Sequence, residues 1–176
     1  MAAVYTAEEI LEIAGGRLAA GNLEPEAGAI CTDTRQITQG DWFVALEGRR
    51  YDGHAFLGDA FANGAIGAIV AERTGYAIAS HSFPLIAVEA TSKALSLLAR
   101  NWRRRINPQV IVLCGDSQEL TELLELVRIA ATNQRLKFAC LNPCTKAQEA
   151  AEFVLNMSEE NKLAIVGLSP CDLNEV

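Results

Sequence analysis

The stretch DTRQITQGDWFVALEGRRYDGHAFLGDAFANGAIGAIV, residues 33–70, decides the expected fold of this chain. Two apolar runs within it, residues 42–46 and 65–70, are short enough to be buried strands. Residues 55–63 lie between them with the pattern of a helix, and Gly64 follows as its C′ residue. A strand, a helix and a strand in this order indicate an α/β domain.

Trp42 and Phe43 are neighbours on the first of these strands. Successive side chains of a strand point to opposite faces, so we expect one of the two to lie in the core and the other to face out. Upstream, Thr6 followed by Glu9 has the pattern of a capping box. It predicts a short amphipathic helix that ends at Gly15-Gly16.

The sequence pattern changes after a long helix that Thr91 caps and that stops at Asn107-Pro108, because proline disfavours helix in the residue before it. Beyond it, apolar runs alternate with two helical patterns; the runs are residues 110–114, 136–141 and 163–168. This alternation implies parallel βαβ units. We therefore expect an α/β domain at 1–107, with a small mixed sheet, and a short three-stranded parallel Rossmann-like segment at 108–176.

Composition and charge narrow the class of protein. The formal net charge of −7 and a pI near 4.9 argue against a nucleic-acid partner, which needs a basic face. We see no secretory signal and no apolar run long enough to span a membrane. The five cysteines are odd in number and lie mostly in apolar runs, which predicts reduced thiols and a cytoplasmic protein without a zinc site.

The order of pieces in residues 33–70 resembles the N-terminal, UDP-sugar-binding domain of the Mur ligase family. The pattern is nearest to that of the D-alanyl-D-alanine-adding members, which show D-S-R, then G-D-x-F-V-A-L-x-G, then D-G-H-x-F and G-A. By this resemblance the triplet Asp33, Thr34 and Arg35 meets the uracil and ribose side of a UDP-sugar. The resemblance also places Asp52, Gly53 and His54 in a nearby substrate-binding loop.

The same residues allow a purely structural interpretation. Asp33 and Thr34 then cap local backbone, Arg35 pairs with an acidic neighbour, and Gly53-His54 forms a tight turn that fixes the next helix. A binding role predicts instead that Arg35 and His54 lie on one rim with Thr34, with their donors available to a ligand. The sequence leaves both interpretations open.

A Mur ligase continues into a central ATPase domain whose first strand ends in a P-loop, T-G-x-x-G-K-[ST]. Its glycines and lysine hold phosphate oxygens, and its hydroxyl binds magnesium. The corresponding residues of this chain are Cys114, Gly115, Asp116, Ser117, Gln118, Glu119, Leu120 and Thr121. Gly115 matches the first glycine, but Gln118 replaces the second glycine. Glu119 and Leu120 replace the lysine and the hydroxyl, and Thr121 comes one residue late.

These replacements predict that neither ATP nor magnesium binds. At roughly 4 Å and an effective dielectric constant of about 20, Glu119 and Asp116 would each repel a phosphate charge by about 4 kcal/mol before screening. By resemblance, Gly167 stands where the family has a glutamate that holds magnesium. We expect no catalytic residue and no metal ligand.

The sequence therefore predicts a truncated, degenerate Mur ligase-like protein, a pseudoenzyme without ligase activity. Its expected role is to bind a UDP-muramoyl-type precursor or a protein, either a cell-wall enzyme or a second copy of itself. One alternative is a subunit of a split ATP-dependent ligase whose ATP site another chain completes. The other is a scaffold that binds no nucleotide.

Overall fold

A computed structural model of the protein describes residues 2–23, 26–48, 51–72, 83–115, 117–144 and 146–168. Its elements in chain order are β1 (Val4–Tyr5), α1 (Ala7–Ala14), β2 (Arg17–Ala20), β3 (Gly28–Cys31), the 3₁₀ helix η1 (Thr34–Gln36), β4 (Trp42–Val44), the 3₁₀ helix η2 (Gly53–Phe56), α2 (Leu57–Ala62), β5 (Gly67–Ala71), β6 (Leu85–Val88), α3 (Thr91–Ile106), β7 (Gln109–Cys114), α4 (Ser117–Asn133), β8 (Phe138–Cys144), α5 (Ala147–Asn156) and β9 (Leu163–Leu168). No helix within these described ranges is both long and apolar enough to cross a membrane.

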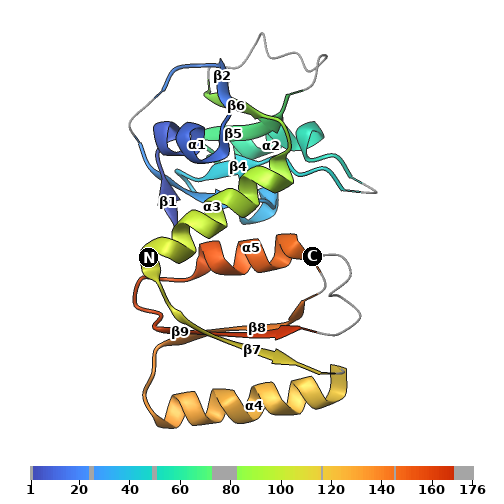
Figure 1. Cartoon of the computed structure of the whole chain (residues 1–176). Helices are drawn as coiled ribbons and strands as arrows, with labels where there is room; N and C mark the ends of the chain where they lie inside the picture. Colours follow the sequence, from blue (N-terminus) through green and yellow to red (C-terminus); the bar gives the residue numbers. More distant parts are fainter. Residues whose placement is uncertain are drawn as a thin grey trace. The chain divides into compact units, whose positions relative to one another are not determined.

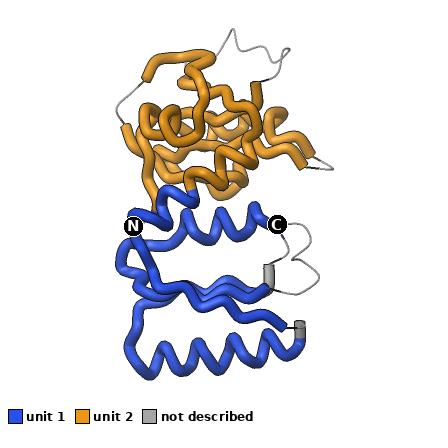
Figure 2. The backbone as a smooth tube through the Cα atoms, in the orientation of Figure 1, with its two compact units in different colours: residues 1–2, 99–176 blue, residues 3–98 orange. Residues whose placement is uncertain are grey.

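The chain forms two compact units (Figure 2). Residues 3–98 form one unit, and the residues from Ala99 onward form most of the other. The division falls inside α3, whereas the sequence pattern changes at Asn107-Pro108, directly after α3 ends. The domain limits 1–107 and 108–176 stay a prediction.

The unit of residues 3–98 is built on a six-stranded mixed sheet with the strand order β1-β3-β4-β5-β6-β2 (Figure 1). The four central strands, β3 to β6, are parallel. The two edge strands, β1 and β2, run antiparallel to their neighbours. The α/β class and the mixed sheet predicted for this part of the chain are confirmed.

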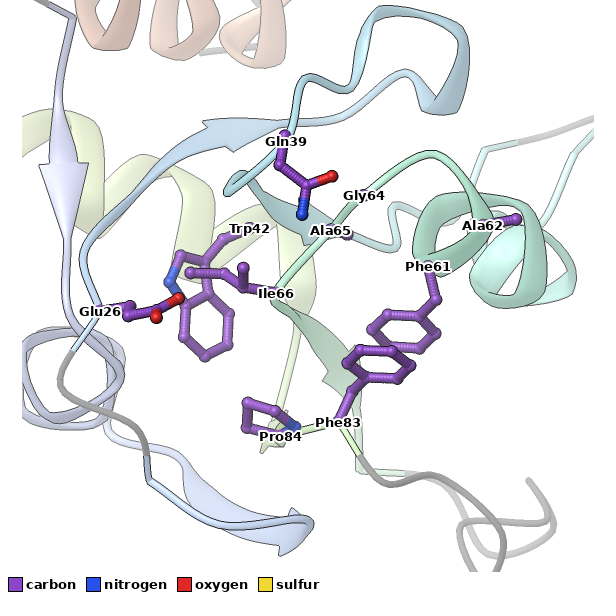
Figure 3. A pocket seen from close by; sticks show the side chains of 10 residues that line it. All are labelled: Glu26, Gln39, Trp42, Phe61, Ala62, Gly64, Ala65, Ile66, Phe83 and Pro84. Carbon is purple, nitrogen blue, oxygen red and sulfur yellow. The ribbon is translucent and has the colours of Figure 1, made fainter.

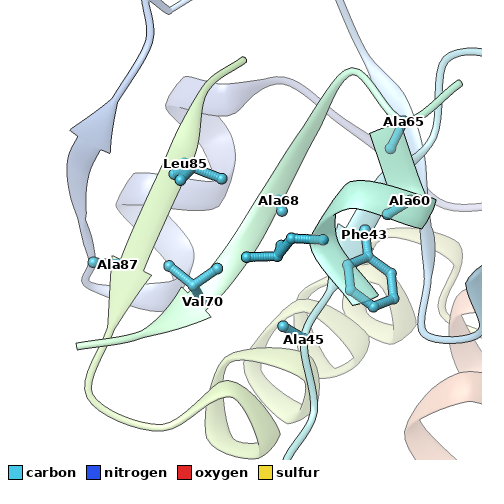
Figure 4. Close-up of a cluster of buried hydrophobic side chains, with 9 residues drawn as sticks. Phe43, Ala45, Ala60, Ala65, Ala68, Val70, Leu85 and Ala87 are labelled. Carbon is cyan, nitrogen blue, oxygen red and sulfur yellow. The ribbon is translucent and has the colours of Figure 1, made fainter. Parts of the chain in front are cut away.

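Trp42 and Phe43 are both buried, at 1% and 2% exposure, so the expectation that one of them faces out is wrong. The physical reason is that β4 is an inner strand of a sheet covered on both faces, as parallel strands usually are. Phe43 lies in an apolar cluster with Leu57 and Ala60 around α2 (Figure 4). The indole of Trp42 fits on the other face because β5 begins with Gly67, where a Cβ would overlap the ring.

The local signals at both ends of α1 and at the end of α2 are confirmed, whereas Thr91 is the first residue of α3 and not its cap. The Thr6 hydroxyl accepts a hydrogen bond from the Glu9 N–H at 3.2 Å, and the Glu9 carboxylate accepts one from the Thr6 N–H at 3.0 Å, which completes the capping box of α1. Gly15 follows α1 in the left-handed conformation with φ +70°. Gly64 follows α2 with φ +103°, a conformation that residues with a Cβ rarely adopt.

The second unit contains the expected three-stranded parallel sheet, in the order β7-β9-β8. Helices α4 and α5 cover its two faces (Figure 1). Leu120 and Leu124 of α4 pack on Ile165 of β9, and this contact forms the core of the unit. The indole N–H of Trp102 donates to the carbonyl of Met157 at 2.9 Å and ties the end of α3 to the end of α5.

Candidate functional site

The two motifs of the first unit follow the carboxyl ends of neighbouring parallel strands. Asp33-Thr34-Arg35 comes after β3, and Asp52-Gly53-His54 comes after β4. In open α/β sheets, ligands bind outside the carboxyl ends of the strands. Both motifs thus lie at the edge of the sheet where ligands of this fold class bind.

The triplet is held together by its own side chains. The Asp33 carboxylate caps η1 by accepting the Arg35 backbone N–H at 3.0 Å. It also accepts from Arg35 Nε at 2.9 Å and from Nη2 at 2.6 Å. The side-chain hydrogen bonds from Arg35 lower the pKa of Asp33 from its ordinary 3.8 to about 2. These contacts engage two of the five N–H groups of a guanidinium whose side chain is 85% exposed.

His54 has a structural role in this fold. Its side chain is fully buried, and its Nε2 accepts a hydrogen bond from the backbone N–H of Ala71 at 2.9 Å. The proton of the neutral ring therefore sits on Nδ1, which lies 2.5 Å from the Asp52 carboxylate. Asp52 also caps η2 by accepting the His54 N–H at 3.0 Å. The histidine joins the loop after β4 to the end of β5.

Gly53 is required by the close approach of two backbone segments. A Cβ at this position would lie 2.7 Å from the backbone N and O of Leu46. The Gly53 N–H already donates to that Leu46 carbonyl at 2.8 Å. The loop geometry therefore matches the structural interpretation of Gly53-His54, a tight turn that fixes the next helix.

The structure ties the two motifs to opposite ends of α2. The Thr34 carbonyl accepts a hydrogen bond from Asn63 at 2.9 Å, at the carboxyl end of α2, whereas His54 lies in η2 before its amino end. A helix of this length spans about 9 Å. The expectation that Arg35 and His54 present available donors on one rim is not met, because the His54 ring is buried and both of its nitrogens are engaged.

A polar cavity of about 140 Å³ lies at the carboxyl edge of the sheet. Its lining comes from the end of β5, the segments after β4 and β6, and the first turn of α3; the residues are Glu47, Ala71, Glu89, Ala90, Thr91 and Ser92. Carboxylates at this edge of an α/β sheet can accept hydrogen bonds from sugar hydroxyls. The sequence pointed to Thr91 only as a helix cap. Because the carboxyl ends of successive parallel strands meet at one edge of a sheet, the positions of Glu47, Glu89 and Thr91 after such strands could have predicted that they lie together.

A larger cavity of about 430 Å³ opens at the opposite, amino edge of the same sheet (Figure 3). Its aromatic wall includes Phe61 and Phe83, whose rings stack with centroids 4.4 Å apart. Trp42 also lines it, and its buried indole N–H has no hydrogen-bond partner in the described part of the chain. Residues 33–35 and 52–54 do not line this cavity.

The segment after β7 lacks the side chains of a phosphate-binding loop at its described positions. Leu120, where the family has a hydroxyl, is 1% exposed and packs in the core. Glu119, where the family has a lysine, is exposed in the first turn of α4, as are Gln118 and Thr121 nearby. Gly167 pairs with Leu113 of β7 and offers no carboxylate. Asp116 and the Ser117 side chain lie outside the described residues.

Comparison with known proteins identifies relatives of the chain. Residues 26–103 match the family described as "Mur ligase family, catalytic domain". The chain is 28% identical over 168 residues to the UDP-N-acetylmuramoyl-tripeptide–D-alanyl-D-alanine ligase of Haemophilus influenzae, covering 89% of this chain and 34% of that protein. The Escherichia coli enzyme of the same name is 34% identical over 112 residues, covering 64% of this chain and 23% of the enzyme.

Solved structures show the same fold. The crystal structure of MurF from Acinetobacter baumannii matches with a TM-score of 0.76 at 23% identity, over 96% of this chain and 36% of that one. MurF from Thermotoga maritima in complex with ADP matches with a TM-score of 0.64 at 25% identity, over 81% of this chain and 32% of that one. The chain thus spans about a third of the length of these relatives, or less.

Proposed function

Because the chain carries a Mur ligase family domain and is related to the peptidoglycan ligases, we propose that it binds a UDP-muramoyl-type precursor without using ATP. The binding site is the carboxyl edge of the six-stranded sheet. This chain would then act as a binding protein linked to peptidoglycan synthesis.

The charged side chains at that edge support the binding of a nucleotide sugar, because they can pair with its phosphates and its sugar hydroxyls. The exposed Arg35 keeps further guanidinium N–H groups beyond the two that bond Asp33, and these can bind a phosphate or a uracil carbonyl. Glu47 and Glu89 line the cavity after β4 and β6 and can accept from sugar hydroxyls. His54 supports the site from inside the core and makes no contact with the ligand.

The burial of Leu120 is the observation that supports the proposal that the chain does not use ATP. A P-loop holds magnesium with a hydroxyl that faces the phosphates. Here that position points into the core against Leu124 and Ile165. Glu119 adds a negative charge where a lysine would neutralise the phosphates of the nucleotide. Gly167 has no carboxylate at the position where the family has a glutamate that binds magnesium. ATP and magnesium are therefore not held by this chain alone.

A second candidate function is a subunit of a split ligase, and the edge of the smaller sheet favours it. Strand β7 pairs only with β9 among the described strands. Its residues Val110, Ile111 and Val112 are exposed, at 37%, 38% and 50%. Parallel strands are normally covered on both faces and flanked by neighbours. A partner chain that adds a strand here would extend the sheet and could supply the missing phosphate ligands.

A thermal-shift experiment tests the proposal. Purified protein is heated with UDP, with UDP-N-acetylmuramoyl tripeptide, or with ATP and magnesium, and cytidine diphosphate serves as the matched control. A ligand at 100 times its dissociation constant stabilises by about 2.7 kcal/mol. We expect the two uridine compounds to raise the melting temperature and ATP to leave it unchanged. Stabilisation by ATP would overturn the proposal that the chain does not use ATP. If neither uridine compound raises the melting temperature, the proposal that the chain binds a UDP-muramoyl-type precursor is overturned.

A further inference from the structure

Helix α4 carries two apolar stripes, and only one of them faces the sheet. Leu120 and Leu124 belong to the core stripe. Leu123, Leu126 and Ile129 form a second stripe, with 41%, 64% and 54% of each residue exposed. Single exposed apolar residues are common on proteins, but residues three apart on a helix are neighbours and make one continuous patch.

The exposed stripe has the same pattern when it is read in either direction. If a second α4 is placed antiparallel with Leu126 on the two-fold axis, Leu126 meets its own copy. Leu123 then lies opposite the partner's Ile129, and the reverse pair forms by symmetry. A two-fold interface requires this kind of self-complementarity, since the same patch is used on both copies.

The charges along α4 favour the antiparallel orientation. Glu119 and Glu122 lie in its first half, and Arg135 follows its last turn. In the antiparallel pair, Arg135 lies at the start of the partner helix, within about one turn of the partner's Glu119. Glu122 lies opposite the partner's Ala130. A parallel pair would instead set Glu119 and Glu122 against their own copies, and the two helix dipoles would repel.

We propose that a second copy of this chain docks on the Leu123-Leu126-Ile129 stripe, antiparallel, with the two-fold axis at Leu126. The interface does not involve the carboxyl edge of the six-stranded sheet, so it does not depend on nucleotide-sugar binding. A single pair of helices buries less than a standard interface of about 1,200 to 2,000 Å². The dimer is therefore weak and forms with rising protein concentration.

Sedimentation velocity over a concentration series tests the proposal. Wild type should pass from monomer to dimer, and Leu126→Glu should stay monomeric because it places two carboxylates together on the axis. Leu23→Glu is the matched control: Leu23 is 41% exposed and lies in the other unit, so this variant should dimerise like wild type. A wild type that stays monomeric, or a control as impaired as Leu126→Glu, would overturn the proposal.

A charge exchange tests the orientation. Arg135→Glu should weaken the dimer about tenfold, because two symmetric attractive pairs become repulsive. Adding Glu119→Arg should restore it by reversing both members of each pair. Circular dichroism checks that each variant keeps its helices. A double variant that dimerises no better than Arg135→Glu would overturn the antiparallel arrangement.

Discussion

Replacing His54 by alanine should destabilise the first unit strongly, because the ring is part of the core. The Ala71 N–H would lose its buried acceptor, which costs about 1–3 kcal/mol. The space left by a side chain that is fully buried adds about 2 kcal/mol by comparison with core truncations. We expect a total loss of about 3–5 kcal/mol in the free energy of unfolding. Asp52→Asn is the matched variant, since its amide oxygen still accepts from His54, and it should lose less than about 1.5 kcal/mol.

Urea unfolding followed by circular dichroism measures both losses. Amide hydrogen exchange adds a local measurement, because the Ala71 N–H should exchange faster in His54→Ala than in Asp52→Asn. A loss below about 1 kcal/mol in His54→Ala, with UDP-sugar binding abolished, would refute the reasoning. The ring would then be a ligand group and not a core group.

Two further predictions follow from the geometry of the same unit. Arg35→Gln should raise the pKa of Asp33 from about 2 toward 3.8, as an NMR titration of the carboxyl group would show. Since the folded pKa is the lower one, the pair stabilises the fold above about pH 4, and this contribution disappears as the pH falls toward 2; an unchanged titration would contradict the pairing. Gly67→Ala should destabilise by about 1–3 kcal/mol because its Cβ would overlap the indole of Trp42, while Gly58→Ala, with open space around it, should lose nothing. Equal stability of the two alanine variants in urea would contradict the packing of Trp42.

Local patterns predicted much of this fold. The capping box of Thr6 and Glu9 depends on residues three apart, and the three parallel strands depend on short apolar runs between helices. Both kinds of signal lie within one element or its neighbours. The burial of Trp42 depends on the position of β4 inside the sheet and on a glycine at residue 67. Such contacts between distant segments leave no periodic pattern in the sequence.

The candidate site was predictable only in part, for the same reason. The motif at residues 52–54 was found, and one partner of the His54 ring, Asp52, belongs to it; the other partner is the backbone N–H of Ala71, on another strand. Asp33 and Arg35 pair within the motif, which is the local arrangement that the structural interpretation described. The cavity of Glu47, Glu89 and Thr91 joins the ends of three strands. Glu47 stands only at a variable position of a quoted motif, and Glu89 and Thr91 lie outside the quoted motifs.

Calorimetric titration of the chain with UDP-N-acetylmuramoyl tripeptide tests the central claim most directly. Wild type should bind with measurable heat, and Arg35→Ala should bind at least about tenfold more weakly at the same salt concentration, because a charge-assisted hydrogen bond is lost. ATP with magnesium should give no binding heat. No heat from the uridine compound at millimolar concentration, or equal affinity in wild type and Arg35→Ala, would contradict a nucleotide-sugar site at this edge of the sheet.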